Sequence, residues 1–213
     1  VTDGGDPEDW FHNNVVWYDA ENDLVLLSAR HKDAIVAVNK TDKTLAWILG
    51  DPTGWEKVDS KYFFTPEGDD FEWQYAQHQV TMLDNGDIML LDNGTAKVKG
   101  VNESERLSGD EVYSRAVIYH IDTENMTILQ VFQYGKERGA AWYSDWVSGV
   151  ISLDGTKDKL WVKAGSHLHS EEENRDDFYP SDMMKPGLVK STHIDQLTNG
   201  ELTYEVVISG DVY

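Results

Sequence analysis

The sequence predicts an all-β protein that forms part of a β-propeller, with about three four-stranded blades. Three observations support this prediction. Short runs rich in Val, Ile, Leu, Tyr and Trp alternate with turns of the Asp-Asn-Gly type. No window has the apolar spacing of an amphipathic helix, so helical structure is expected only as a turn within a loop. The same succession of four strands occurs three times along the chain, which is typical of propeller blades.

The first unit comprises approximately residues 9–72. Its four predicted strands are residues 15–18, 24–29, 35–38 and 45–49, each a short run of aliphatic or aromatic residues that ends at a polar turn. The turns between them contain Asp, Asn and Lys, which favour reversal of the chain.

The second unit comprises approximately residues 73–140 and repeats this order. QVTMLD at 79–84 leads into DIMLLDNG at 87–94, and RAVIYHID at 115–122 and ILQVFQYG at 128–135 follow as the third and fourth strands. The pairing of the first two runs across a short Asn-Gly turn predicts a hairpin.

The third unit comprises approximately residues 141–213. SGVISLD at 148–154, KLWVKAGS at 159–166, GLVKSTHID at 187–195 and ELTYEVVIS at 201–209 supply its four strands. The three units differ chiefly in their loops, at residues 51–71, 95–112 and 168–186.

Three blades do not close a propeller, which typically needs about 4–8. Residues 1–213 are therefore interpreted as a half β-propeller. The remaining blades are expected from missing upstream sequence or from another chain, and a homodimer is a further possibility. A β-sandwich of about a dozen strands is the alternative fold.

Charge and composition exclude several classes of function. The 213 residues contain 39 acidic and 18 basic side chains, for a net charge of −21, which disfavours nucleic acid and anionic membranes as partners. No apolar run approaches the roughly 18 residues that span a bilayer. A hydrophobic content of 40% nevertheless predicts a folded core. The sequence contains no Cys, so neither disulfides nor thiolate sites form within the chain.

Polar residues recur where the first strand of each unit begins, namely His12, His78 and Ser148. In a propeller these strand starts face the central channel, so the side chains converge. Arg30 ends the second strand of the first unit, and Asn93 takes the matching position in the second. Two imidazoles and a guanidinium would form an anion site. The alternative is that the histidines are turn residues and that Arg30 pairs with a carboxylate.

Four motifs together resemble the bacterial arylsulfate sulfotransferases. They are DWFHNN at 9–14, LLSARHKDAIVAVN at 26–39, WILGDPTGW at 47–55 and QHQVTMLDNGDIMLLDNG at 77–94. The resemblance implies a six-bladed propeller, of which this chain is similar to the C-terminal half. The family's longer chain also has an N-terminal domain and three earlier blades, and another active-site histidine comes from one of those blades.

The resemblance assigns roles to individual residues. It implies that His78 is the histidine that becomes sulfated, and that His12 and Arg30 are catalytic. Asn14 and Ser148 are expected to bind substrate, Ser148 as the best match to a hydroxyl residue of the family's site. Seven aromatic residues near the expected rim are candidates to hold the aryl ring: Trp10, Phe11, Trp73, Tyr75, Trp142, Tyr143 and Trp146.

The implied reaction moves a sulfuryl group from an aryl sulfate to a phenolic acceptor by a ping-pong mechanism through a sulfohistidine, without a cofactor. The resemblance also implies a periplasmic or secreted location. A non-catalytic propeller that binds a ligand or carbohydrate is the alternative function, and a scaffold for protein partners is a third.

The sequence predicts no metal site. His167, His169 and Glu171–Glu173 form an HLHSEEE cluster, but its loop position and the charged residues that follow favour a solvated insertion.

Overall fold

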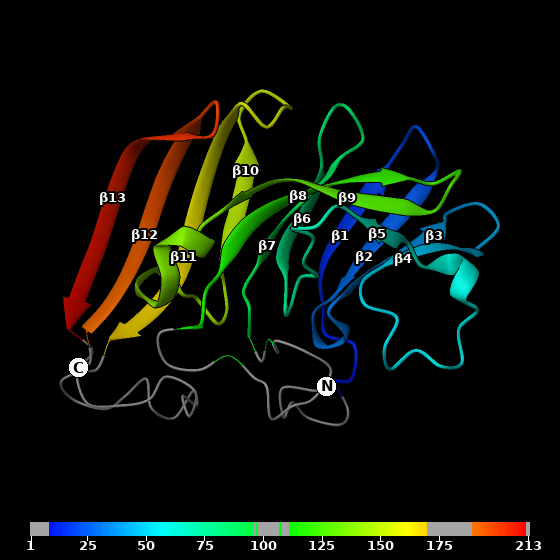
Figure 1. Ribbon diagram of the computed structural model, residues 1–213, viewed down its shortest axis with the longest axis horizontal. Coiled ribbons are helices and arrows are strands. Elements are labelled where there is room, and N and C mark those ends of the chain that lie inside the picture. Colours follow the sequence, from blue (N-terminus) through cyan, green and yellow to red (C-terminus); the bar gives the residue numbers. More distant parts are fainter. Residues whose placement is uncertain (1–8, 96, 98–106, 108–110, 170–188, 212–213) are drawn as a thin grey trace.

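The described part of the chain forms three mainly antiparallel β-sheets that follow one another in chain order (Figure 1). A computed structural model describes residues 9–95, 97, 107, 111–169 and 189–211. Within this part of the chain the regular structure is β-strand, apart from short 3-10 turns at Arg30–Lys32 (η1), Ser60–Tyr62 (η2) and Lys136–Trp142 (η5). The all-β prediction is confirmed, and the helical turns lie between strands as expected.

The first sheet contains β1 (Asn13–Asp19), β2 (Leu24–Ala29), β3 (Ala34–Asn39) and β4 (Leu45–Leu49). Each strand pairs with the next in sequence, which is a simple meander. The predicted strand starts and ends agree with these bounds to within two residues, because each polar turn interrupts the apolar run where the strand ends.

The second sheet contains β6 (His78–Met82), β7 (Ile88–Asp92), β8 (Arg115–Asp122) and β9 (Thr127–Tyr134), again in chain order. A fifth strand, β5 (Thr65–Glu67), pairs in parallel with β9. This addition lies within the predicted loop at 51–71. All three of its residues are exposed, so no apolar pattern marks it in the sequence.

The third sheet contains β10 (Gly149–Ser152), β11 (Lys159–His169), β12 (Val189–Thr198) and β13 (Glu201–Asp211). The last three strands are longer than predicted, and β11 extends into the region expected to be loop. His167 and His169 lie in β11, whereas their side chains and Glu171–Glu173 lie outside the described residues.

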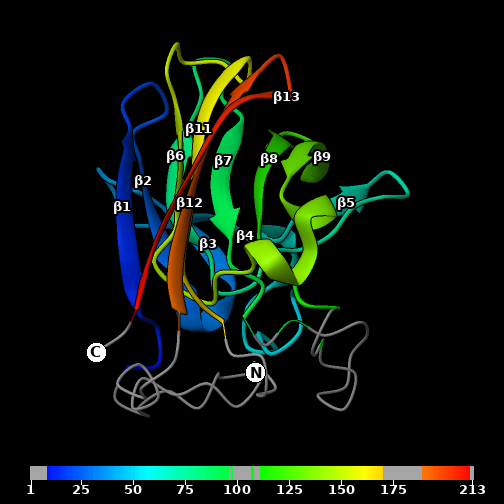
Figure 2. The same cartoon turned by 90° about the vertical axis from the view of Figure 1, so that its left-hand side faces the viewer.

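Two hydrophobic cores join the three sheets, and β7 contributes to both. Ile88 and Leu90 pack with residues of the first sheet such as Leu26, whereas Met89 and Leu91 pack toward the third sheet. Successive side chains of a strand point to opposite faces, and here both faces are covered. Figure 2 looks along this row of sheets from the side of the third.

No helix among the described residues has the length and apolarity to cross a membrane.

Candidate active site

His12 and Arg30 lie at the same edge of the first sheet. His12 directly precedes β1, and Arg30 directly follows β2, its antiparallel neighbour. The backbone N–H of Arg30 donates to the carbonyl of His12 at 3.1 Å. His12 has a φ of 47°, a left-handed conformation that non-glycine residues seldom adopt. The backbone therefore places these two residues beside each other at this edge of the sheet.

His78 occupies the corresponding edge of the second sheet, at the first residue of β6. The pairing of β6 with β7 shifts register between His78 and Thr81, and Gln79 within this step has a φ of 52°. Such a bulge redirects a side chain relative to the regular pleat. The local irregularity thus sets the direction of the His78 ring.

Asn93, directly after β7, holds the imidazole of His78. The Oδ1 atom of Asn93 lies 2.7 Å from Nδ1 of His78. The Nδ2 atom of Asn93 donates to the carbonyl of Ser144 at 2.6 Å and to Oγ of Ser148 at 2.7 Å. Because a carbonyl only accepts, these bonds fix the amide orientation, and Nδ1 of His78 must be the donor to Oδ1. The lone pair of neutral His78 is consequently on Nε2.

The environment of His78 favours its neutral form. Burial lowers the pKa of His78 below its ordinary value, and electrostatic interaction with Arg30 and His12 lowers it further, although the bond to Asn93 opposes these effects. A half-buried, neutral imidazole with a lone pair on Nε2 is suited to nucleophilic attack.

Ser148 joins this group through Asn93, whose amide donates to the serine hydroxyl. Each unit's first strand leads to an aspartate: Asp19, Asp84 or Asp154. Six places before these aspartates lie Asn13, His78 and Ser148. Ser148 is therefore the equivalent of His78, whereas His12 lies one place earlier in its own unit.

Arg30 lies close to the third unit as well. Its Nη2 atom is 3.4 Å from the carbonyl of Asp145 and donates to it. Burial raises the pKa of the Asp145 carboxyl to about 6, and the charge of Arg30 opposes that shift. Arg30 also lowers the pKa of His78 through its charge, which indicates that His78 is close to it. The guanidinium of Arg30, a residue of the first unit, therefore lies near His78 of the second unit and Asp145 of the third.

Asn14 connects the first two units. Its Nδ2 donates to the carbonyl of Gln77 at 2.8 Å, which positions the residue before His78. Its Oδ1 is buried and has no hydrogen-bond partner within the described part of the chain. The structure thus places Asn14 beside the His78 segment.

The comparison with protein families matches the arylsulfotransferase (ASST) family over residues 1–211. The chain belongs to this family. It is 33% identical over 178 residues to the arylsulfate sulfotransferase AssT of Lelliottia amnigena, in an alignment that covers 76% of this chain and 29% of that protein. It is 30% identical over 224 residues to arylsulfate sulfotransferase AssT of Escherichia coli O6:H1 strain CFT073, covering 97% and 34% respectively. The chain spans about a third of the length of these curated relatives.

Gln77 is a residue of the candidate site for which the sequence pattern predicts no role. Its Nε2 donates to the carbonyl of Ala34 at 2.9 Å and to Oγ of Ser28 at 3.1 Å, both in the first sheet. Gln77 is fully buried, so it ties the segment that carries His78 to the first sheet. The sequence signal that could have indicated a role for Gln77 is its position directly before His78 in the QH motif.

The aromatic residues proposed to hold an aryl ring differ in their environments. Trp142 is 1% exposed in the core between the second and third sheets, and its indole N–H donates to Asp195 at 3.0 Å. It is therefore unavailable to an aryl ring. Trp10 is 58% exposed, beside Phe11 and the His12 segment, and its ring lies 5.2 Å from that of Phe11.

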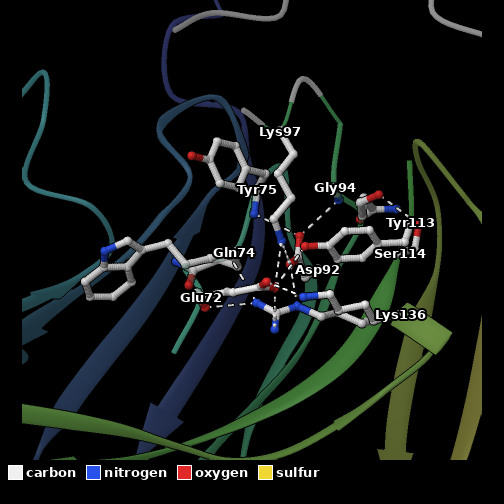
Figure 3. A network of polar contacts seen from close by, with 12 residues as sticks. Glu72, Gln74, Tyr75, Asp92, Gly94, Lys97, Tyr113, Ser114 and Lys136 are labelled. Atoms are coloured by element: carbon white, nitrogen blue, oxygen red, sulfur yellow. Dashed lines mark hydrogen bonds and ion pairs between the residues drawn. The ribbon is translucent and has the colours of Figure 1, made fainter. Parts of the chain in front are cut away.

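A buried charged network supports the end of β7, one residue before Asn93 (Figure 3). Asp92 is fully buried and accepts from Nζ of Lys97 and Nε of Arg115, both at 2.9 Å. Burial raises the pKa of Asp92, but the charges of Lys97 and Arg115 outweigh it and hold the pKa below its usual value. Glu72 contacts the same cations and also Lys136. This network anchors the backbone from which Asn93 extends.

Proposed function

We propose that this chain carries the sulfuryl-transfer residues of an arylsulfate sulfotransferase, with His78 as the nucleophile. The observation that carries the proposal is the state of His78: it is half-buried, its Nδ1 proton is held by Asn93, and its pKa is lowered by burial and by Arg30 and His12. Membership of the arylsulfotransferase family supports the substrate class, an aryl sulfate donor and a phenolic acceptor.

The first half of the proposed ping-pong reaction forms a sulfohistidine. The lone pair of Nε2 of His78 attacks the sulfur of the aryl sulfate, and the N–S bond forms as the bond from sulfur to the aryl oxygen breaks. The electron pair of that bond leaves with the phenolate. A neutral nitrogen approaches the anionic ester with less repulsion than a carboxylate would experience.

The second half returns His78 to its starting form. The oxygen of a second phenol, after losing its proton to a base, attacks the sulfur, and the pair of the N–S bond returns to Nε2. Arg30 and His12 stabilise the charge on the sulfuryl oxygens throughout, since preorganised cationic donors act at the atoms where charge develops. We assign Asn14 and Ser148 to substrate binding. Asn14 lies beside the His78 segment, and Ser148 contacts Asn93, which holds His78.

The same proposal interprets the three sheets as three blades of a six-bladed propeller, with boundaries near 9–72, 73–140 and 141–213. The end sheets support this interpretation because their outer faces are apolar. Val16 and Tyr18 of β1 are 61% and 45% exposed on the first sheet. Ile151, Tyr204 and Ile208 are 48%, 50% and 59% exposed on the third. Further blades would bury both faces, from upstream sequence, another chain or a second copy.

The experiment is transfer from p-nitrophenyl sulfate to phenol, measured as nitrophenol release by the assembly with a complete ring. We expect release by the wild type and none by His78→Asn, because the amide lacks the nucleophilic nitrogen. Circular dichroism controls for folding of the variant. Retained release by His78→Asn would refute the assigned nucleophile, and a wild-type assembly that releases no nitrophenol would refute the enzyme. The family resemblance favours a periplasmic or secreted location, which cell fractionation tests.

A further inference from the structure

Three potential metal ligands come together beside the proposed sulfuryl site. Asp9, His12 and His31 each offer one ligand atom, and these atoms all lie within 4.8 Å of one another. His12 and Asp9 precede β1, whereas His31 belongs to η1 after β2, so the cluster joins two separate segments of the first sheet. It was not apparent in the sequence, because the spacing from His12 to His31 matches no short metal motif.

The cluster is held in place by contacts that do not involve a metal. The carboxylate of Asp9 accepts from the backbone N–H of His12 at 3.1 Å and from Nδ1 of the same residue. Nδ1 of His31 donates to the carbonyl of Asp9 at 2.6 Å, and the backbone N–H of His31 donates to the carbonyl of Phe11 at 3.4 Å. The two imidazole rings lie 4.5 Å apart, centre to centre, with a tilt of 37°. The two segments are therefore preorganised.

The ligand types select the class of metal. Two imidazole nitrogens and one carboxylate oxygen suit Zn²⁺, which takes such ligands in tetrahedral geometry, whereas Ca²⁺ and Mg²⁺ prefer all-oxygen sites. Three protein ligands leave a fourth position for water. Asp9 is exposed and both histidines are half-buried, so an ion can reach them from solvent. The net charge of −21 favours cation approach, against the local positive charges of Arg30 and Lys32.

We propose that Asp9, His12 and His31 form a binding site for a zinc-class divalent cation. When the ion binds, the metal takes the place of the proton between His12 and Asp9, and His31 exchanges its bond to the Asp9 carbonyl for the metal. The three ligand atoms already lie within 4.8 Å of one another. They must close further on the ion to reach zinc–ligand distances of about 2.0–2.2 Å.

The direct test is a titration of the metal-free protein with Co²⁺, whose visible absorption reports tetrahedral nitrogen and oxygen coordination, followed by displacement with Zn²⁺. We expect one Co²⁺ per chain at this site. His31→Gln should weaken binding at least tenfold, in line with the loss of a metal-site residue. An absence of Co²⁺ absorption, or equal binding by His31→Gln, would overturn the proposal.

Matched variants identify the ligands. His120 is an exposed histidine whose Nδ1 lies 2.7 Å from Oδ1 of Asp87, a histidine–carboxylate pair outside the three-residue cluster. His120→Gln should bind Co²⁺ as the wild type does. A double variant at His167 and His169 should also leave binding unchanged. If either control weakens binding as much as His31→Gln does, the cluster is not the site.

A second consequence rests on the proposed function. A bound Zn²⁺ occupies the imidazole of His12 and so prevents it from donating to the sulfuryl oxygens. Zn²⁺ should therefore inhibit nitrophenol release, EDTA should restore it, and His31→Gln should resist the inhibition. Unchanged release at a Zn²⁺ concentration that fills the site would refute this consequence. If the metal-free assembly releases no nitrophenol, the proposed function fails, while the Co²⁺ titration still decides whether the site exists.

Discussion

Asn93 determines which nitrogen of His78 is available for chemistry. Its amide donates to Ser144 and Ser148, so its oxygen can only face Nδ1 of His78. The sequence predicts a catalytic role for His78. It predicts for Asn93 only a position equivalent to that of Arg30, because Asp-Asn-Gly is an ordinary turn sequence. The contacts that give Asn93 its role come from residues more than fifty places later, which no local pattern reveals.

Asn93→Ala should lower the rate of sulfuryl transfer by roughly 10- to 100-fold, because the ring of His78 loses the acceptor that orients it. The measurement is kcat for nitrophenol release. Asn85 provides a matched control, since it stands in the other Asp-Asn-Gly sequence of the second unit and its side chain bonds within its own turn, to Asp87. Asn85→Ala should keep nearly wild-type activity. Equal losses in the two variants would show that Asn93 has only a turn-forming role.

The pKa of His78 predicts the pH dependence of the first half-reaction. Burial lowers this pKa, and Arg30 and His12 lower it further, so the neutral imidazole is already abundant below the ordinary histidine value of about 6.5. Single-turnover nitrophenol release should rise with pH and level off with an inflection below that value. Arg30→Ala should move the inflection to higher pH and cost about 10²–10³ in rate.

Arg30→Lys separates the two contributions of the arginine. It keeps the positive charge, so the inflection should stay where it is in the wild type, but it loses the planar fork that binds an oxyanion. An inflection that moves equally in both variants would contradict the electrostatic explanation.

At the scale of the elements, the strands that pack on both faces were the easiest to predict. β7 is buried at every position, and its run of apolar residues ends at a polar turn on each side. β5 was missed because its three residues are exposed and owe their conformation to pairing with β9. The long ends of β11, β12 and β13 were missed for a related reason: they form by mutual pairing, and β13 is exposed along almost its whole length.

The charged network at the end of β7 should contribute strongly to stability. Asp92→Asn leaves Lys97 and Arg115 buried beside a neutral amide, and we expect a loss of about 3–5 kcal/mol in the free energy of unfolding, as is usual when one partner of a buried pair is removed. Urea denaturation measures it. Glu124→Gln, in an exposed turn, is the control and should change stability by less than about 0.5 kcal/mol. If Asp92→Asn lowered the free energy of unfolding by no more than Glu124→Gln does, the charged network would contribute little to stability.

At the scale of the whole molecule, the chain forms a row of three sheets whose two outer faces carry exposed apolar side chains. The sequence repeat predicted the number of sheets and their strand order, since each unit has its own apolar pattern. It did not reveal how Arg30, His78 and Ser148 come together, because that depends on contacts between units such as those of Asn93 and Gln77.

The isolated chain is expected to show no turnover with p-nitrophenyl sulfate and phenol, because the family resemblance implies a further site histidine on an earlier blade. The measurement compares nitrophenol release by the 213-residue chain with release by an assembly that includes the remaining blades. Analytical ultracentrifugation defines the oligomeric state. Turnover by a chain shown to be monomeric would contradict the prediction and would mean that these three sheets suffice.

The two separate cores also have a consequence for how the molecule opens. The first and third sheets each pack on the second and have no core in common. Loss of the third sheet therefore removes only one of the two interfaces, so partial opening costs less free energy than global unfolding. Ser148, on the third sheet's side, is joined to His78 through hydrogen bonds to Asn93. Hydrogen exchange would thus detect loosening of the candidate site before the central strands lose their protection.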